Sequence, residues 1–333
     1  MNQQALEKLL HWLNGKGFGR FFILRPENFS WLTGGGDNTV VAGEGVAWLE
    51  VVEGKVGLHT SRIEAARLVE EEINGIDEME VYPWHSLPEP GRPNDLEHDL
   101  TPLRLVLSPE EQERFRHLGR DAAQALGEAM RAAKPDWTER ELAGAVAEAL
   151  YEKGIQPVVL LVAGEERLFK WRHPLPKDRP LGQLCMAVVC GRRQGLVANL
   201  TRLRSFGHPE ARGLYEKVLQ VEAAALDASL PGATLSEGIA AIREAYRVIG
   251  RPEAFEEHHQ GGIAGYRPRE VLATPGNTTK LSAGMAVAWN PSLPGAKVED
   301  TFLITERGLE NLTFDPLWPR ETVAGRERPT LLE

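Results

Sequence analysis

Two adjacent histidines, His258 and His259, stand just before the glycine pair Gly261-Gly262. Imidazole changes its charge near neutral pH and is also a common metal ligand. Glycines beside it allow a ligand to approach the backbone closely. The same residues would also fit a plain turn that side-chain hydrogen bonds stabilise. The spacing therefore marks His258 as a candidate pocket residue, with a structural turn as the alternative.

The other potentially reactive groups support less chemistry. Cys185 and Cys190, the only cysteines, lie five residues apart in an apolar run, so an extended strand points them to opposite faces. No disulfide framework is expected, which predicts a reducing compartment. The turn Gly34-Gly35-Gly36 lacks the spacing and the lysine of a phosphate-binding loop, which argues against nucleotide binding.

The most informative stretch is GQLCMAVVCGRRQGLVANLTRLR, residues 182–204. Residues 185–190 are apolar and rich in β-branched side chains, 191–194 form a polar corner, and 195–203 alternate well enough to return alongside. We therefore expect a hairpin of two strands. It resembles the metal-binding hairpin of the creatinase/aminopeptidase P/prolidase family, whose pattern is G-D-x-[apolar]3-D, a glycine, and then D-[IL]-T-R.

Gly182, Gly195 and Asn199-Leu200-Thr201-Arg202 match this pattern, but its two aspartates are missing. The resemblance implies two divalent metals held by two Asp, one His and two Glu, with a bridging water for amide hydrolysis. The five ligand positions hold, in order, Val188, Asn199, Gly262, Asn290 and Glu299. Because one carboxylate cannot hold two dications against water, we expect no metal cofactor.

Other positions that match functional residues of the family still carry side chains that can transfer protons or bind a ligand. His173 matches a substrate-side histidine, and His258 matches the histidine that handles protons or the transition state. Imidazole together with carboxylate suits acid–base catalysis near neutral pH. The resemblance thus implies His173, His258 and Glu299 as candidate catalytic residues. The expected ligand pocket adds His259, Asn199, Asn290, Tyr266, Arg269, Val188 and Gly262.

Three functions remain open. The loss of four ligands out of five favours a metal-free binder of a small amide, peptide or amino-acid-like ligand, without peptidase turnover. The second is a metal-free C–N hydrolase similar to creatinase, with His173 or His258 as acid or base and Glu299 as anchor. The third is a proline-directed metallopeptidase with relocated ligands at Glu257, His258, His259 and Glu299. It has the least support, since adjacent histidines seldom aim at one metal.

The elements that position these residues divide into two domains, as expected for a chain of 333 residues. The predicted N-terminal elements are helices over 2–14 and 61–72 (capped by Ser61 and Glu64), and strands over 20–24, 38–42, 45–52, 55–59 and 79–82. A proline-rich stretch, 87–102, follows them. We therefore predict a creatinase-like α/β domain over 1–103 and a second domain over 104–333.

The second domain contains an internal duplication. The pattern Pro-x-x-Thr-x-x-Glu occurs at 135–141 and again at 231–237, and each copy is a capping box that starts a helix. Each copy follows a long predicted helix, 109–133 or 208–230, and precedes a strand that begins Met-Ala-Val. The predicted fold is α/β, and the resemblance implies a pita-bread domain, with two αβ halves around the active site.

Composition limits the partners. A net charge of −10 and a pI near 5.5 argue against nucleic acid or an anionic membrane. The N-terminus is amphipathic rather than signal-like, and no apolar run approaches about 18 residues, so we expect a cytoplasmic protein. The resemblance implies a homodimer. The sequence leaves open whether residues 312–333 pack on the body or form an arm.

Overall fold

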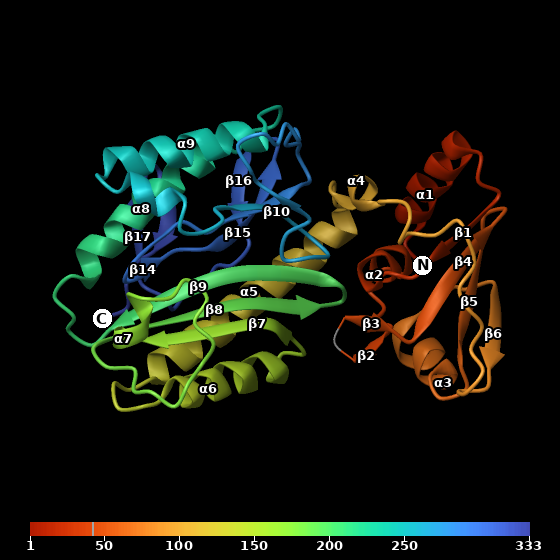
Figure 1. Ribbon diagram of the computed structural model, residues 1–333, viewed down its shortest axis with the longest axis horizontal. Coiled ribbons are helices and arrows are strands. Elements are labelled where there is room, and N and C mark those ends of the chain that lie inside the picture. Colours follow the sequence, from red (N-terminus) through yellow and green to blue (C-terminus); the bar gives the residue numbers. More distant parts are fainter. Residues whose placement is uncertain (42) are drawn as a thin grey trace. The chain divides into compact units, whose positions relative to one another are not determined.

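A computed structural model describes residues 1–41 and 43–333 (Figure 1). They form two compact units. Unit 1 comprises residues 1–111 and 194–196, and unit 2 comprises 112–193 and 197–333. The predicted domain limit after residue 103 stays a prediction. Ala42, the last residue of the strand predicted over 38–42, lies outside the described residues.

Unit 1 is built around one four-stranded sheet, whose order is β1-β4-β5-β6. Asn2 caps the first helix through its side chain, and Gly17, with φ 73°, ends it. The sheet strands are β1 (Arg20–Ile23), β4 (Ala47–Val52), β5 (Lys55–Ser61) and β6 (Glu78–Tyr82). The other elements are α1 (Gln3–Lys16), α2 (Pro26–Thr33), β2 (Thr39–Val41), β3 (Glu44–Gly45), α3 (Ala65–Arg67), the π-helix η1 (Leu68–Glu72) and α4 (Thr101–Arg104).

Two local predictions for unit 1 are wrong. The helix predicted from Ser61 is shorter, because Ser61 still belongs to β5, where it pairs with Tyr82. Regular helix begins only at Ala65 and has no side-chain cap. The strand predicted over 45–52 is divided into β3, which pairs with β2 outside the main sheet, and β4, which belongs to that sheet. In both cases strand pairing decides the outcome over local sequence signals.

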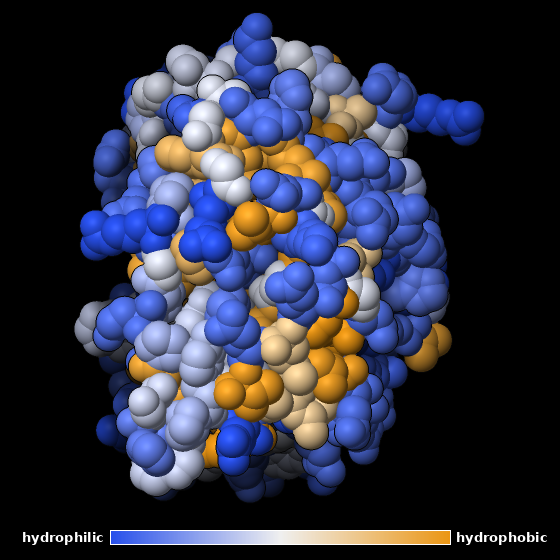
Figure 2. Space-filling model, turned by 90° about the vertical axis from the view of Figure 1, so that its right-hand side faces the viewer, coloured by the Kyte–Doolittle hydropathy of each residue, from blue (hydrophilic) through white to orange (hydrophobic). Residues whose placement is uncertain are grey.

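The strand β6 is an edge of this sheet and pairs only with β5 among the described strands. Its Met79 and Val81, and Trp84 just beyond it, are exposed apolar side chains. Figure 2 looks onto the side of unit 1 where β6 lies and shows apolar groups gathered among hydrophilic ones. Edge strands with apolar side chains can pair with another chain.

Unit 2 begins with two helices packed on a three-stranded antiparallel sheet (Figure 1). The helices are α5 (Pro109–Ala132) and α6 (Glu139–Glu152), and the strands are β7 (Gln156–Gly164), β8 (Leu184–Arg193) and β9 (Leu196–Ser205), with the short α7 (Glu165–Leu168) between β7 and β8. The hairpin predicted at 182–204 is present as β8 and β9. Gln194 and Gly195 both have positive φ, as a two-residue hairpin turn of type I′ requires.

The second half of unit 2 repeats this plan. Two helices, α8 (Ala211–Asp227) and α9 (Leu235–Val248), lie against a five-stranded sheet of order β11-β10-β12-β15-β16 (Figure 1). Its strands are β10 (Gly261–Ala264), β11 (Val271–Leu272), β12 (Ala286–Trp289), β15 (Asp300–Thr305) and β16 (Gly308–Asn311), and η2 (Pro252–Phe255) and the hairpin β13 (Ser292–Leu293) and β14 (Ala296–Lys297) complete it.

Both predicted capping boxes are present. Thr138 and Glu141 cap α6, and Thr234 and Glu237 cap α9. Each capping threonine also forms an isolated bridge to a residue outside the named strands, Thr138 with Pro180 and Thr234 with Lys280. The duplication read from the sequence therefore extends to tertiary contacts. No described helix has the length and apolar character needed to cross a membrane.

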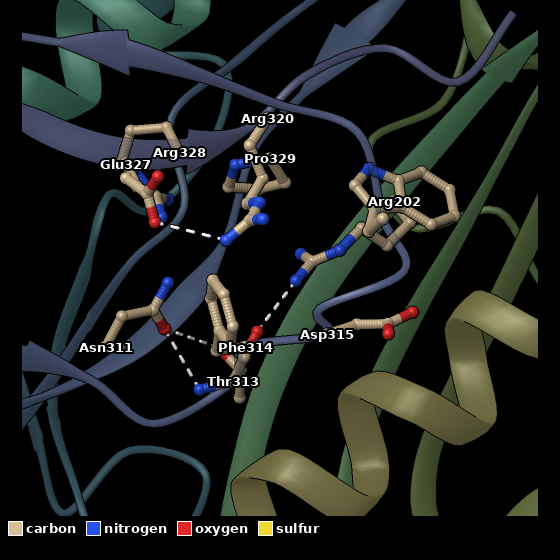
Figure 3. Close-up of a pocket in the computed structure, with 10 residues that line it drawn as sticks. Arg202, Asn311, Thr313, Phe314, Asp315, Arg320, Glu327, Arg328 and Pro329 are labelled. Carbon is tan, nitrogen blue, oxygen red and sulfur yellow. Dashed lines mark hydrogen bonds and ion pairs between the residues drawn. The ribbon is translucent and has the colours of Figure 1, made fainter.

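The C-terminal segment packs on unit 2. Its hairpin, β17 (Arg320–Val323) and β18 (Arg326–Pro329), is held by a buried ionic network. The Arg328 guanidinium donates to Glu222 at 2.8 and 2.6 Å and to Asp300 at 2.8 Å, and Arg202 donates to Asp300 at 2.9 Å. Figure 3 shows Arg202 and Arg328 beside the residues of the C-terminal hairpin. The void there, about 10 Å³, has room for about one water.

Candidate functional site

A cavity of about 280 Å³ lies within unit 2, between its two halves. Antiparallel contact between Thr201 of β9 and Glu299 joins the two sheets there, with the Thr201 amide donating to the Glu299 carbonyl at 2.9 Å. The cavity is lined by Val159, Leu161, His173, Val188, Cys190, His259, Pro268, Arg269, Asn290, Lys297 and Glu299. The volume is near the lower end of ligand pockets, roughly 300 Å³, which limits an occupant to a small molecule.

One wall of the cavity is a buried ionic cluster. Glu299 is 2% exposed, and its carboxylate accepts from Arg269 Nη2 at 2.6 Å and lies 3.3 Å from Lys297 Nζ. The Thr201 hydroxyl also donates to it at 3.2 Å. Burial alone raises the pKa of Glu299, but attraction to Lys297 and Arg269 outweighs burial and lowers the pKa to about 2. The carboxylate is therefore ionised at neutral pH.

Three histidines meet at the cavity. His173 lies in the loop between α7 and β8, and His258 and His259 lie between η2 and β10. The two loops are tied together by an ion pair between Arg172 and Glu257. His173 Nε2 and His258 Nε2 are 2.9 Å apart, and the rings of His258 and His259 stack with centroids 4.4 Å apart.

These imidazoles are uncharged at neutral pH. Burial, followed by repulsion from Lys297, lowers the pKa of His258 to about 2. Burial, followed by repulsion from Arg269 and Lys297, lowers the pKa of His259 to about 4, and the pKa of His173 is lowered mainly by burial as well. A base so weak takes up a substrate proton poorly at neutral pH.

The histidine cluster also has the geometry of a possible metal group. One nitrogen from each of His173, His258 and His259 lies within 4.8 Å of the others. The cations Lys297 and Arg269 act electrostatically on this cluster, which opposes binding of a further cation. Glu257, the carboxylate that the relocated-ligand hypothesis places beside these histidines, forms an ion pair with Arg172.

Most of the predicted pocket residues come together. Val188, Asn290, Arg269, His173, His259 and Glu299 line the cavity, and His258 contacts two of them. The other three do not line it. Asn199 is fully buried, and its amide accepts no hydrogen bond at Oδ1 from a described residue. Tyr266 is buried, and its hydroxyl accepts a hydrogen bond from Arg114 at 3.0 Å.

Gly262 is the third position that does not line the cavity. It lies in β10 and has φ 153°, a conformation that side chains rarely adopt. A Cβ placed there would stand 2.1 Å from the Val271 carbonyl oxygen and 2.9 Å from the Ala273 nitrogen. The backbone around Gly262 thus admits no histidine without rearrangement.

Sequence reasoning missed one important residue, Lys297. It is only 4% exposed and stands two positions before Glu299. In extended chain, residues two apart share a face, so a period-two reading from Glu299 would have found it. The apolar wall, Val159, Leu161 and Pro268, gave no such signal. Cys190 also lines the cavity, and burial raises the pKa of its thiol to about 12, so it is no thiolate nucleophile at neutral pH.

Comparison with known proteins fits this architecture. Residues 113–306, more than half of the chain, match the model of metallopeptidase family M24. The chain belongs to metallopeptidase family M24. This M24 protein is 25% identical over 236 residues to an uncharacterized peptidase of Staphylococcus saprophyticus, with 66% of this chain and 65% of the relative covered. It is 27% identical over 224 residues to a probable dipeptidase PepE of Mycobacterium bovis, with 64% and 60% covered.

Solved structures agree with the fold over nearly the whole M24 protein. A prolidase from Pyrococcus horikoshii has a TM-score of 0.77 at 20% identity, covering 93% of this chain and 98% of the other. The N-terminal domain of the FACT complex subunit SPT16 from chickpea has a TM-score of 0.68 at 12% identity, covering 94% and 95%. The predicted α/β fold with a pita-bread domain is thereby confirmed.

Proposed function

We propose that this M24 protein binds a small amide, peptide or amino-acid-like ligand in the unit 2 cavity, without dinuclear metal catalysis. The observation that carries the proposal is the engagement of Glu299, the one carboxylate kept at the five ligand positions, by Lys297 and Arg269. A carboxylate held by two cations is a poor ligand for a dication, and the fixed positive charges repel metal ions.

The remaining donors support the same view. Val188 has no donor atom, and Asn199 and Asn290 are neutral amides that offer a dication far less than carboxylates do. Gly262 has no side chain, and its backbone leaves no room for one. These residues do not fit a pair of divalent metals, so no step of the proposed function passes through such a pair.

The fold itself does not require peptidase activity. The chickpea neighbour is named as a domain of a FACT complex subunit rather than as a peptidase. Similarity at this identity shows the fold alone, so the function has to come from the site. The cavity then serves as a binding pocket of small volume with polar and apolar walls.

A second candidate is a metal-free hydrolase that uses His173 or His258 as acid or base, with Glu299 as anchor. The 2.9 Å distance between their Nε2 atoms favours this mechanism, because one ring can donate a hydrogen bond to the other and a proton can lie between them. The lowered pKa of both rings and the ion-paired state of Glu299 weaken it. Turnover of a C–N bond that survives both His173→Ala and His258→Ala would exclude this mechanism.

Metal content tests the main proposal. The protein is incubated with excess Mn²⁺, Co²⁺ or Zn²⁺, desalted, and measured by elemental analysis, with Xaa-Pro dipeptide hydrolysis assayed on the same samples. We expect far less than one metal per chain and no hydrolysis. Two metals per chain with hydrolysis would overturn the proposal.

A single metal per chain would also count against a metal-free protein. If His173→Ala removed that metal and the exposed-site control His11→Ala retained it, the metal would belong to the histidine cluster. A homodimer in the cytoplasm, without nucleic acid or membrane partners, is proposed as well. Light scattering of the purified protein measures the dimer.

A further inference from the structure

The charges around the cavity do not balance. Lys297 and Arg269 contribute two cations, and Glu299 is the only carboxylate among the lining residues, which leaves one surplus positive charge. The same three groups are the charges that act on the thiol of Cys190, at another wall of the cavity. A buried charge without a counterion is costly, so the site favours an anion.

Hydrogen-bonding groups in the cavity are unbalanced too. A lysine ammonium carries three N–H donors, and Lys297 has one ionic partner among the described residues, Glu299. Arg269 Nε, also an N–H donor, is buried and lacks a partner within the same described part of the chain. Buried polar groups that lack partners point to a bound molecule that supplies them.

Another wall of the cavity is apolar. Val159, Leu161 and Val188 come from β7 and β8, and Pro268 comes from the loop that carries Arg269. Apolar surface of this kind gains free energy when a hydrocarbon group covers it. Inorganic anions, such as phosphate, have no hydrocarbon group that could cover this apolar surface. An organic anion with a small branched body can use both walls at once.

We propose that the cavity binds a small organic monocarboxylate, whose carboxylate lies against Lys297 and Arg269 and whose apolar body contacts Val159, Leu161 and Val188. This inference rests on the proposed binding function and narrows its ligand class to acids. The Lys297 ammonium supplies the positive charge that would otherwise come from a metal. Neutral amides of the same shape bind weakly because they leave the surplus charge unpaired.

The test compares an acid with its amide by isothermal titration calorimetry. The probes are isovalerate and isovaleramide, followed by N-acetyl-L-valine and its amide, and inorganic phosphate as the anion without an apolar body. We expect each carboxylate to bind at least about tenfold more tightly than its amide, or about 1.4 kcal/mol, and more tightly than phosphate. Equal binding of acid and amide, tighter binding of phosphate, or binding of none up to roughly 10 mM would overturn the proposal.

Two variants change the charge in opposite directions. Lys297→Met should weaken isovalerate binding at least about tenfold, and Glu299→Gln, which frees both cations, should strengthen it. The control Lys217→Met changes an exposed lysine of α8 and should leave binding unchanged. Circular dichroism confirms folding, and if either variant fails to fold, the acid–amide comparison on the unaltered protein still decides. Unchanged binding in folded Lys297→Met would contradict the proposal.

Failure of this inference can be told from failure of the proposed function. The titrations use protein dialysed against a chelator, and elemental analysis is made on the same sample. Acid binding that disappears with the chelator and returns with Mn²⁺ would contradict the metal-independent function and the lysine-based site together. Amide or dipeptide binding without acid preference would leave the binding function in place and remove only the carboxylate assignment.

Discussion

Glu299 and Asp300 are neighbours in sequence, and both are buried carboxylates that each contact two cations. Because side chains alternate in extended chain, they face opposite sides. On one side, Lys297 and Arg269 hold Glu299 at the edge of a cavity of about 280 Å³. On the other, Arg202 and Arg328 hold Asp300 in packed surroundings, with a void of about 10 Å³ nearby.

The two clusters differ in charge balance. Around Asp300, two arginines meet two carboxylates, because Glu222 accepts two hydrogen bonds from Arg328. Thr313 completes the set by donating to Asp300 at 2.6 Å. Around Glu299, two cations meet one carboxylate. Balanced buried charges hold a segment in place, whereas a surplus charge beside a cavity makes a binding site.

The largest expected effect is in the balanced network. Arg328→Met leaves Glu222 and Asp300 buried with too few cations, and should lower the free energy of unfolding by about 3–5 kcal/mol. Urea denaturation measures it. The control Arg326→Met, two residues away, removes a partly exposed pair with Asp227 and should cost no more than about 1 kcal/mol. Equal losses in both variants would show that the buried network has no special role.

The next effect concerns the pH dependence of the cavity cluster. The folded-state pKa of Glu299 is lowered to about 2 from 4.5, so its ionised form contributes stability that is fully present above pH 4.5 and is lost as pH falls toward 2. The loss amounts to about 3 kcal/mol. Denaturation curves between pH 6 and pH 3 should therefore fall less steeply for Glu299→Gln than for the unaltered protein. Parallel pH dependence in both would be the contrary result.

A smaller effect separates the two clusters directly. Lys297→Met removes the surplus charge and leaves Glu299 with Arg269 and the Thr201 hydroxyl, so stability without ligand should change by no more than about 1 kcal/mol. Residues that serve binding rather than folding commonly behave in this way. If Lys297→Met lowered the free energy of unfolding as much as Arg328→Met does in the same urea experiment, Lys297 would be a structural residue, and the two clusters would not differ in role.

The smallest effect is an absence of titration. Since the pKa of His258 is lowered to about 2 and that of His259 to about 4, neither ring should gain a proton between pH 8 and pH 5. Long-range ¹H–¹⁵N NMR follows both rings, with a histidine-containing peptide as reference, whose pKa is about 6.5. A midpoint near 6.5 for either ring would mean that burial and the neighbouring cations do not lower its pKa.

Much of the fold could be predicted because its signals are local. The capping boxes at Thr138 and Thr234 satisfy helix amides within one turn, and the apolar run before Gln194-Gly195 fits a buried strand and tight turn. The helix predicted from Ser61 failed since pairing of Ser61 with Tyr82, a distant contact, extends β5 instead.

For the site, the sequence by itself determined which donors are missing. Val188 and Gly262 have no side-chain donor atom for a metal in any fold, and Asn290 remains a neutral amide. Only the tertiary structure decided that Lys297 and Arg269 converge on Glu299. It also decided that Arg202 and Arg328, which are distant in sequence, form ion pairs with the neighbouring Asp300. The reason is physical: a side chain's identity fixes its chemistry, whereas charge balance depends on partners that only folding brings within reach.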